Sequence, residues 1–366
     1  MKCAVSLLNY RPGSVGGIET YIRKLSEIYA ADPSGHEITF IAGAHVADQL
    51  PTGARRQLVP HAPPTLIAGR CMEAFTPLRA ARLARQIDAA GYDVILFPQQ
   101  SIFPIGIQTP AVLTVVDVQH LHRPEHYPLF DTCFRRTIYP RSLARAQRII
   151  AISQVTQRDL VELCNVAAEK IEVVHLGFDR TPPPPADERL VERPYLYYPA
   201  ATFAHKGHAD LLRCFARLKV RHAHDITLVF SGMQTALWRQ LKKQIAALGL
   251  QRDVAHLGFV DYEGIPSLYQ HAEAVVFPSQ FEGFGMPVLE AVRYRKPIFC
   301  SDLPIFDELG VPAANRIDFT DPDALIGIMQ RLQPTALLKE PISWDECAKK
   351  TLQVMAKTVE SAGKGI

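Results

Sequence analysis

Short apolar runs alternate with longer amphipathic stretches along most of the chain, and this alternation constrains the fold more than any other feature. Parallel strands that are buried on both faces read as such runs, and crossover helices must join them. The pattern therefore predicts an α/β protein with two doubly wound, Rossmann-like parallel sheets. The expected strands are 4–8, 38–42, 94–97, 111–116 and 148–152 in the first half, and 195–198, 226–230, 254–257, 274–277 and 297–300 in the second.

Four consecutive prolines, Pro182 to Pro185, interrupt the alternation near the middle of the chain. Proline lacks an amide donor and favours extended backbone, so this run is typical of a linker. We expect an N-terminal domain over 1–180, a linker over 181–193 and a C-terminal domain over 194–342. Two such domains would place the carboxyl ends of both sheets, where doubly wound sheets bind ligands, around one cleft.

The final segment, 343–366, predicts a helix. Apolar residues recur at spacings of three and four between Trp344 and Glu360, which indicates an amphipathic helix. Ser343 lies just before this helix and Glu346 follows three residues later, so the two form a capping box.

Composition excludes several classes of protein. Of the 366 residues, 48% are hydrophobic and 21% are charged, and a formal charge of +3 is too small to predict nucleic-acid binding. The seven cysteines are scattered with no C-x-x-C pair, so they encode neither a disulfide framework nor a zinc site. The N-terminus does not read as a signal peptide, and no stretch approaches ~20 apolar residues. We expect a cytoplasmic protein, at most peripheral at the inner face of a membrane.

The segment after the fourth apolar run of the second half is the strongest candidate for chemistry. Gly283 and Gly285 let the backbone turn closely past a ligand, and the free amides that follow at a helix start can bind a diphosphate. Glu282 and Glu290 can both face this site, and carboxylates accept hydrogen bonds from sugar hydroxyls. The alternative is a capped helix in which the glycines only make a turn and Glu290 complements the helix dipole.

The whole string from Pro278 to Ala291 resembles the E-x7-E signature of the retaining glycosyltransferases of family 4, which are two-domain GT-B enzymes. The resemblance spans nearly the whole chain and implies a nucleoside-diphosphate sugar as donor, with Glu282 at the sugar and Glu290 at the ribose. It also implies that the terminal helix 343–366 crosses back onto the first domain. Further donor contacts that it implies are Gly16, Gly17, Gly258, Gly283, Phe284, Gly285, Met286 and Val288.

The segment from Tyr198 to His208 resembles the diphosphate-binding stretch of the family. Lys206 would stabilise the negative charge that develops on the leaving diphosphate, and His205 lies beside it. Many members carry an arginine about five residues before this lysine, where the present chain has Ala201, so His205 or a group of the N-terminal domain is expected to complete the diphosphate clamp. The alternative reading of Lys206 is a solvated lysine, although a cation is unfavourable at a helix start without an anion.

The stretch Asp117 to His120 resembles the DxQH variant of the family's catalytic-side loop. Elsewhere in the family a histidine stands immediately before the aspartate, where this chain has Val116. We therefore expect His120 to contact the donor sugar or the acceptor, and Asp117 to orient it.

No metal or other cofactor is expected. His120, His122 and His126 fit no standard zinc spacing, and no carboxylate pair suited to Mg²⁺ stands beside them. Asp321-Pro322-Asp323 mimics a metal-binding triplet, but it follows no strand of the expected sheet and is better explained as a turn and helix cap.

Six arginines and no acidic residue occur between positions 132 and 158, interleaved with aromatic and aliphatic residues. Such a surface, with Arg135 and Arg136 at its centre, can bind anionic lipid headgroups or a lipid-diphosphate acceptor. The alternative is a solvated helix face over an apolar stripe.

These features predict a retaining, metal-independent glycosyltransferase that moves a sugar from a nucleotide-sugar donor to a hydroxyl of a glycan or lipid-linked acceptor. The DxQH resemblance implies mannose from GDP-mannose, in lipopolysaccharide or exopolysaccharide biosynthesis. Two alternatives remain open: a nucleotide-sugar epimerase or phosphorylase of the same architecture, and a non-catalytic scaffold subunit that binds nucleotide sugars.

Overall fold

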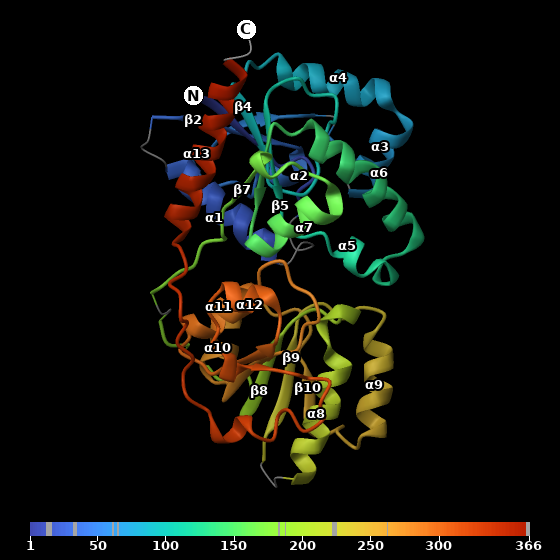
Figure 1. The fold of residues 1–366 in the computed structure, drawn as a ribbon, viewed down its shortest axis with the longest axis vertical. Helices are drawn as coiled ribbons and strands as arrows, with labels where there is room; N and C mark the ends of the chain where they lie inside the picture. The colour runs from blue at the N-terminus through green and yellow to red at the C-terminus, as the bar shows by residue number, and fades with distance from the viewer. Residues whose placement is uncertain are drawn as a thin grey trace. The chain divides into compact units, whose positions relative to one another are not determined.

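The computed structural model describes residues 1–11, 17–31, 35–60, 62–63, 66–181, 184–186, 188–221, 225–261 and 263–363. The chain divides into two compact units (Figure 1). Unit 1 comprises Met1–Phe178 and Ile342–Ile366, and unit 2 comprises Asp179–Pro341. The segment expected as a linker, 181–193, is therefore counted with unit 2.

Unit 1 is built on a parallel sheet whose seven described strands run in the order β3-β2-β1-β4-β5-β6-β7. All five strands predicted for this half are present, and the first lies two residues earlier than predicted. β3 and β7 are additional edge strands; β3 is largely exposed, so it has no apolar run to reveal it. The strands are β1 (Lys2–Ser6), β2 (Glu37–Ala42), β3 (Arg55–Leu58), β4 (Val94–Phe97), β5 (Ala111–Val115), β6 (Arg148–Ala151) and β7 (Ile171–Val173).

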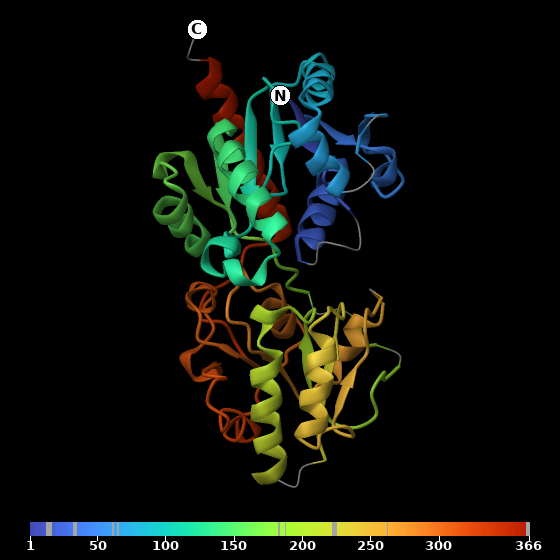
Figure 2. The same cartoon turned by 90° about the vertical axis from the view of Figure 1, so that its right-hand side faces the viewer.

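Helices cover both faces of this sheet (Figure 2). One face packs on α1 (Gly17–Ala31) and α13 (Trp344–Gly363). The other face forms a core with α4 (Pro77–Asp88), α6 (Leu129–Arg145) and α7 (Gln154–Cys164). Shorter helices are α2 (Ala44–Ala47), α3 (Leu66–Phe75) and α5 (Gln119–His122).

The C-terminal helix α13 belongs to unit 1, as predicted. Its first turn is capped by Ser343, whose Oγ accepts a hydrogen bond from the amide of Glu346 at 3.1 Å. The Tyr29 hydroxyl of α1 donates to the carbonyl of Ala348 at 3.1 Å, which fixes α13 against α1. Within the described ranges, no helix combines the length and apolar character that crossing a bilayer requires.

Unit 2 contains a second parallel sheet, whose six described strands run in the order β10-β9-β8-β11-β12-β13. All five predicted strands are present, and β13 is an additional two-residue edge strand. The strands are β8 (Tyr195–Pro199), β9 (Thr227–Ser231), β10 (Val254–His256), β11 (Ala274–Phe277), β12 (Ile298–Ser301) and β13 (Arg316–Ile317). The helices are α8 (His208–Arg221), α9 (Trp238–Ala247), α10 (Ile265–Gln270), α11 (Met286–Arg293) and α12 (Pro304–Glu308).

Both sheets reverse their winding direction once, which confirms the predicted doubly wound architecture. From β8 the chain proceeds outward through β9 and β10, then returns to the other side of β8 as β11. In unit 1 the equivalent reversal lies between β1 and β4. At such a switch point the loops that leave the carboxyl ends of the two strands diverge, and the gap between them is where doubly wound sheets bind ligands.

An aromatic row buries two histidines on the α8 and α9 face of unit 2. Tyr198, Phe230 and His256 lie side by side on β8, β9 and β10. His208 of α8 packs on Tyr198 with ring centroids 4.7 Å apart, and Trp238 of α9 packs on His256 at 4.6 Å. Burial, assisted by His256 and Lys206, lowers the pKa of His208 to about 3, and burial lowers the pKa of His256 to about 4.

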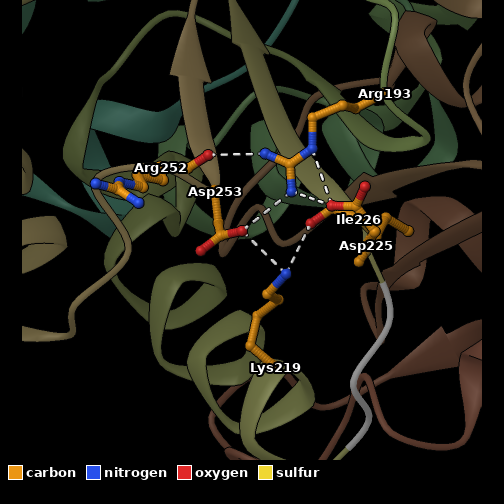
Figure 3. Close-up of polar contacts among 6 residues, drawn as sticks. All are labelled: Arg193, Lys219, Asp225, Ile226, Arg252 and Asp253. Carbon is orange, nitrogen blue, oxygen red and sulfur yellow. Dashed lines mark hydrogen bonds and ion pairs between the residues drawn. The ribbon is translucent and has the colours of Figure 1, made fainter.

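A charged network ties together the amino-terminal ends of β8, β9 and β10 (Figure 3). Asp253 accepts from the guanidinium of Arg193 at 3.4 Å and from Lys219 Nζ at 2.9 Å. Arg193 also contacts Asp225 and donates to the carbonyl of Arg252 at 2.9 Å. The network lies at the edge of the sheet opposite the switch-point loops, so its role is structural.

Removing the carboxylate of Asp253, which contacts both Arg193 and Lys219, should destabilise unit 2 more than removing that of Asp225. We expect Asp253→Ala to lower the free energy of unfolding by ~1 kcal/mol, because Lys219 loses its ion pair and Arg193 loses one of its two carboxylates. Asp225→Ala should cost less than ~0.5 kcal/mol, because that carboxylate is 75% exposed. Urea unfolding followed by Trp238 fluorescence in a Trp344→Phe background isolates unit 2, since each unit holds one of the two tryptophans. Equal effects of the two substitutions would contradict this assignment.

The buried His208 should make unit 2 sensitive to acid. The unfolded chain takes up a proton at a pKa near ~6.5, whereas the folded chain resists it down to about 3, so stability is lost as the pH falls below ~6.5. Between pH 7 and pH 5 this single group should cost about 2 kcal/mol. His208→Leu and His208→Phe should both remove that part of the pH dependence in the Trp238 assay. A slope of unfolding free energy against pH that neither variant changes would refute the prediction.

Candidate functional site

The loops that follow β8 and β11 lie against each other at the switch point of unit 2. The amide of Gln280, after β11, donates to the carbonyl of His205, after β8, at 2.7 Å. The Gln280 side chain donates to Asp210 Oδ2 of α8 at 3.0 Å. The hydroxyl of buried Tyr198 donates to the carbonyl of Lys206 at 2.6 Å. These bonds fix the two loops as one rigid surface.

Two glycines permit this close approach. Gly207 has φ +66°, and a Cβ there would lie 2.1 Å from the carbonyl oxygen of Pro278. Gly285, the N-cap of α11, has φ +94°, and a Cβ there would lie 2.7 Å from the ring of Phe306. Neither position accepts a side chain. Both glycines are buried, and their role is to let the backbones pack closely beside the start of α11.

The structure brings Lys206 and Glu282 together, although they lie 76 residues apart in the sequence. Lys206 Nζ lies 2.5 Å from Glu282 Oε1, and their side chains are only 19% and 11% exposed. The ammonium also lies 5.6 Å from the centre of the Phe277 ring, at the end of β11. The alternative of a freely solvated lysine is therefore wrong. An ammonium held beside a carboxylate at a switch point can exchange that partner for a phosphate oxygen.

The other residues predicted to contact the donor differ in how far their side chains are buried. Phe284 and Val288 have buried side chains, and the Val288 amide donates to the carbonyl of Gly285 at 3.0 Å, so the prediction that Val288 contacts the donor has no free group to support it. Gly283 and Met286 are half-buried at the start of α11, and Pro287 lies in its first turn as predicted. His205 stacks on the half-exposed ring of Phe203, with ring centroids 5.9 Å apart.

Glu290 lies on α11 and is held by an aromatic pair. Its Oε2 accepts a hydrogen bond from the hydroxyl of Tyr269 at 2.5 Å, and the Tyr269 ring stacks on Tyr294 at 4.9 Å. Burial raises the pKa of Glu290, although the hydrogen bond from Tyr269 and the charge of Arg293 oppose this effect. The carboxylate is thus oriented through one oxygen, and its second oxygen remains for another donor.

Exposed apolar side chains follow β8, β9 and β10, and the loops after β9 and β10 are those where the family resemblance places the base and the ribose. Phe203, Met233 and Phe259 are 44%, 53% and 78% exposed. The loops that carry them are joined by a hydrogen bond of 2.7 Å from the amide of Gly232 to the carbonyl of Gly258. Gly258 has φ +71°. Exposed apolar side chains at the carboxyl ends of neighbouring strands suit a planar base. The available signal was a bulky apolar residue shortly after each strand.

In unit 1, Gly16 lies outside the described residues, and Gly17 is exposed at the start of α1, after β1. Asp117 follows β5 and accepts a hydrogen bond from the amide of Gln119 at 3.0 Å. The backbone carbonyl of Asp117 accepts a hydrogen bond from the side chain of Gln100 at 3.1 Å. Val116, which stands where the family's usual histidine would be, is half-buried.

His120 is buried beneath α6 and is only 4% exposed. Its ring meets the edge of Tyr139 with centroids 5.1 Å apart, and its Nδ1 has no hydrogen-bond partner in the described structure. Burial, with the nearby charges of Arg135 and Arg136, lowers the pKa of His120 to about 4. The imidazole is therefore neutral near pH 7, and it faces a cavity of about 470 Å³ between α6 and α7.

The two arginines predicted to form one surface have different environments. Arg135 is mostly buried: its guanidinium lies 4.6 Å from the centre of the Tyr127 ring, donates to the Tyr139 hydroxyl at 2.8 Å and lies 3.7 Å from Asp131. Arg136 is exposed at the mouth of the same cavity. Only Arg136 is a surface cation as predicted, because the aromatic rings around Arg135 draw its side chain inward.

The histidines near Asp117 do not converge on one point. His122 Nε2 pairs with Asp159 of α7 at 2.8 Å, whereas His120 faces the cavity. Across the described residues, no three His, Cys, Asp or Glu side chains are arranged to hold a metal ion. Asp321 and Asp323 lie in a turn, and Asp323 pairs with Arg217.

Comparison with known proteins matches both halves of the chain to glycosyltransferase families. Residues 15–182 match the model of Glycosyltransferase Family 4, and residues 185–351 match that of Glycosyl transferases group 1. O-antigen chain mannosyltransferase B of Escherichia coli is 27% identical over 267 residues, which cover 66% of this chain and 69% of the relative. O-antigen chain mannosyltransferase RfbU of Salmonella typhimurium is 25% identical over 197 residues, 54% of this chain and 53% of the relative.

Solved structures share the fold at low sequence identity. Anabaena Alr3699/HepE in complex with UDP and glucose has a TM-score of 0.69 and 18% identity, covering 97% of this chain and 99% of that one. WaaG, a glycosyltransferase involved in lipopolysaccharide biosynthesis, has a TM-score of 0.60 and 15% identity, covering 98% and 94%. Because the two family models together match most of the chain, and both units have the doubly wound fold, the chain belongs to glycosyltransferase family 4 and is a GT-B glycosyltransferase.

Proposed function

We propose that the chain transfers a sugar, with retention of anomeric configuration, from a nucleoside diphosphate to a hydroxyl of a glycan or lipid-linked acceptor. The observation that carries this proposal is the Lys206–Glu282 pair, fixed at the switch point beside the start of α11. A cation and backbone amides suit a diphosphate, and carboxylates suit the hydroxyls of sugar and ribose. Glu282 and Glu290 provide those carboxylates on the two sides of the α11 start.

The charge balance of the pair supports this role. Without a ligand, Lys206 and Glu282 compensate each other at low exposure. A diphosphate brings excess negative charge, so the ammonium turns one or more of its three donors to phosphate oxygens. Glu282 can then accept a hydrogen bond from a sugar hydroxyl. Because bond cleavage adds charge to the leaving diphosphate, the ammonium stabilises the transition state more than the bound donor.

The proposed reaction is balanced without a protein base. The bond between the anomeric carbon and the diphosphate oxygen breaks, and a bond to the acceptor oxygen forms on the same face. The acceptor proton passes to the departing phosphate oxygen. The Lys206 ammonium and the α11 amides then neutralise the leaving group, the role that a divalent cation would otherwise fill. We include metal independence in the proposal for this reason.

For the donor we propose GDP-mannose, because O-antigen chain mannosyltransferase B and RfbU are named as mannosyltransferases. Their names also support an acceptor in O-antigen synthesis. A thermal-shift screen with GDP, UDP and ADP identifies the base, since a ligand at a hundredfold excess over Kd stabilises its protein by ~2.7 kcal/mol. Incubation with the donor alone separates transfer from epimerisation, because only an epimerase would convert the sugar without an acceptor.

Removing the ammonium should affect chemistry more than donor binding. We expect Lys206→Ala to lower kcat by ~10²-fold, and Lys206→Arg to retain part of the activity, because the lost charge stabilises the leaving group. Lys242→Ala, an exposed lysine on α9, is the matched control and should leave kcat unchanged. Initial rates with the donor identified in the screen measure the effect. Full activity of Lys206→Ala would exclude the proposed role, and nucleotide binding without any turnover of the unaltered chain would favour the scaffold alternative.

Neutralising Glu290 should affect recognition of the ribose. We expect Glu290→Gln to raise KM for the donor ~10-fold with little change in kcat, because a charged hydrogen bond to the ribose becomes a neutral one. Tyr269→Phe should have a smaller effect in the same direction, since it removes only the group that orients Glu290. A donor with deoxyribose provides the check: the unaltered chain should lose affinity for it, and Glu290→Gln should lose little more. Additive losses would show that Glu290 does not bind the ribose.

A further inference from the structure

The cavity between α6 and α7 is the feature of unit 1 that the proposed transfer reaction does not use. Its floor and walls are apolar: Val115 of β5, Leu143 of α6, and Leu160 and Leu163 of α7 line it. Val115, Leu143 and Leu160 are also core residues of this face of the sheet. At about 470 Å³ the cavity is of the size that binds small molecules rather than water alone.

One end of the cavity is polar and cationic. Asp117, His120, Arg135 and Arg136 lie at this end, which adjoins the carboxyl end of β5. His120 is only 4% exposed, and its Nδ1 has no partner in the described structure and is itself closed off from the cavity. A ligand group at this end would therefore be recognised through the cationic side chains that line it, and not through this nitrogen.

The cationic side chains that line the cavity differ in whether they already have partners within the protein. Arg135 is committed to Tyr139 and Asp131, and Lys170 at the far end donates to the carbonyls of Leu143 and Ala144 at 2.6 and 3.1 Å. Arg136 has neither an ion pair nor a hydrogen bond among the described residues, and its side chain is exposed at the mouth. An anionic group at the mouth would therefore meet Arg136 first.

We propose that this cavity binds one amphiphile, with its phosphate at Arg136 and its hydrocarbon tail between α6 and α7. From Arg136 to Ala144, α6 rises ~12 Å at 1.5 Å per residue, so the apolar part extends well beyond the head. A tail there replaces water along apolar walls, and the phosphate compensates a cation, so both ends are complementary.

That this amphiphile is the sugar acceptor rests on the proposed function, whereas its binding does not. The phosphate lies at the carboxyl end of β5, next to the loop of Asp117 and His120. A glycan attached to the phosphate would leave the cavity at this end of the sheet. The tail would anchor the acceptor in unit 1, while the sugar donor binds to unit 2.

Binding of decyl phosphate by calorimetry to the full chain tests the proposal. We expect saturable binding of one molecule per chain, at least tenfold weaker binding of butyl phosphate, which lacks the tail, and of decanol, which lacks the charge. Arg136→Gln should weaken decyl phosphate binding about tenfold. Arg141→Gln is the matched control, because Arg141 is exposed on the same helix but does not line the cavity. Equal affinities of Arg136→Gln and the unaltered chain would overturn the proposal.

A substitution that fills the cavity tests whether the ligand binds inside it or whether a membrane binds to the surface around it. Ala144→Trp places a large ring in the apolar part from an exposed position, so it should abolish decyl phosphate binding without lowering the melting temperature. Should it prove unstable, Leu163→Asp at a 45% exposed position provides a second test of the apolar wall. Co-sedimentation with phosphatidylglycerol vesicles is the second arm. If the chain binds vesicles, neither variant changes this binding, and decyl phosphate does not bind, the region is a membrane contact and the cavity proposal is refuted.

Nucleotide binding keeps the two proposals distinguishable. A thermal shift with the nucleotide found in the screen reports on unit 2, and we expect Arg136→Gln and Ala144→Trp to leave it unchanged. If nucleotide binds and decyl phosphate does not, the cavity proposal fails and the proposed function stands. If decyl phosphate binds and no nucleotide does, the proposed donor site fails and the cavity proposal stands.

Discussion

The contact between the loops after β8 and β11 is the constraint on which the donor half depends. The carbonyl of Pro278 leaves no room for a side chain at Gly207, and the amide of Gln280 is bonded across to His205. This close backbone approach places Lys206 Nζ 2.5 Å from Glu282. A larger residue at Gly207 would separate the loops, and with them the cation from the α11 amides that together form the proposed diphosphate site.

Stability and chemistry are located at opposite edges of the same sheet. The network of Arg193, Lys219 and Asp253 joins the amino-terminal ends of the strands, while the loops with Gly207 and Gly285 lie at the carboxyl ends. Between them, buried aromatic side chains and His208 fill the layer under α8 and α9. Ligand exchange at Lys206 therefore takes place on a framework that is tied elsewhere, so the loops need not contribute to holding the sheet together.

The sequence predicted the buried part of the fold well and its edges poorly. All ten predicted strands are present: nine are largely buried, and β10, a half-buried edge strand, still reads as a short apolar run. β3, β7 and β13 were missed because edge strands are short and partly exposed, so hydrophobic patterning does not mark them. The capping box at Ser343 and the helix start at Gly285 were predictable, since both depend on a few neighbouring residues.

Local sequence determined which residue types stand after each strand, and thus the chemistry available at the carboxyl ends of both sheets. It did not determine which of these side chains meet. The pairing of Lys206 with Glu282 depends on β8 and β11 being neighbours, a consequence of winding that links positions 76 residues apart. Likewise, only packing distinguishes buried Arg135 from exposed Arg136, because adjacent positions on a helix point in different directions and only α6's neighbours decide which is covered.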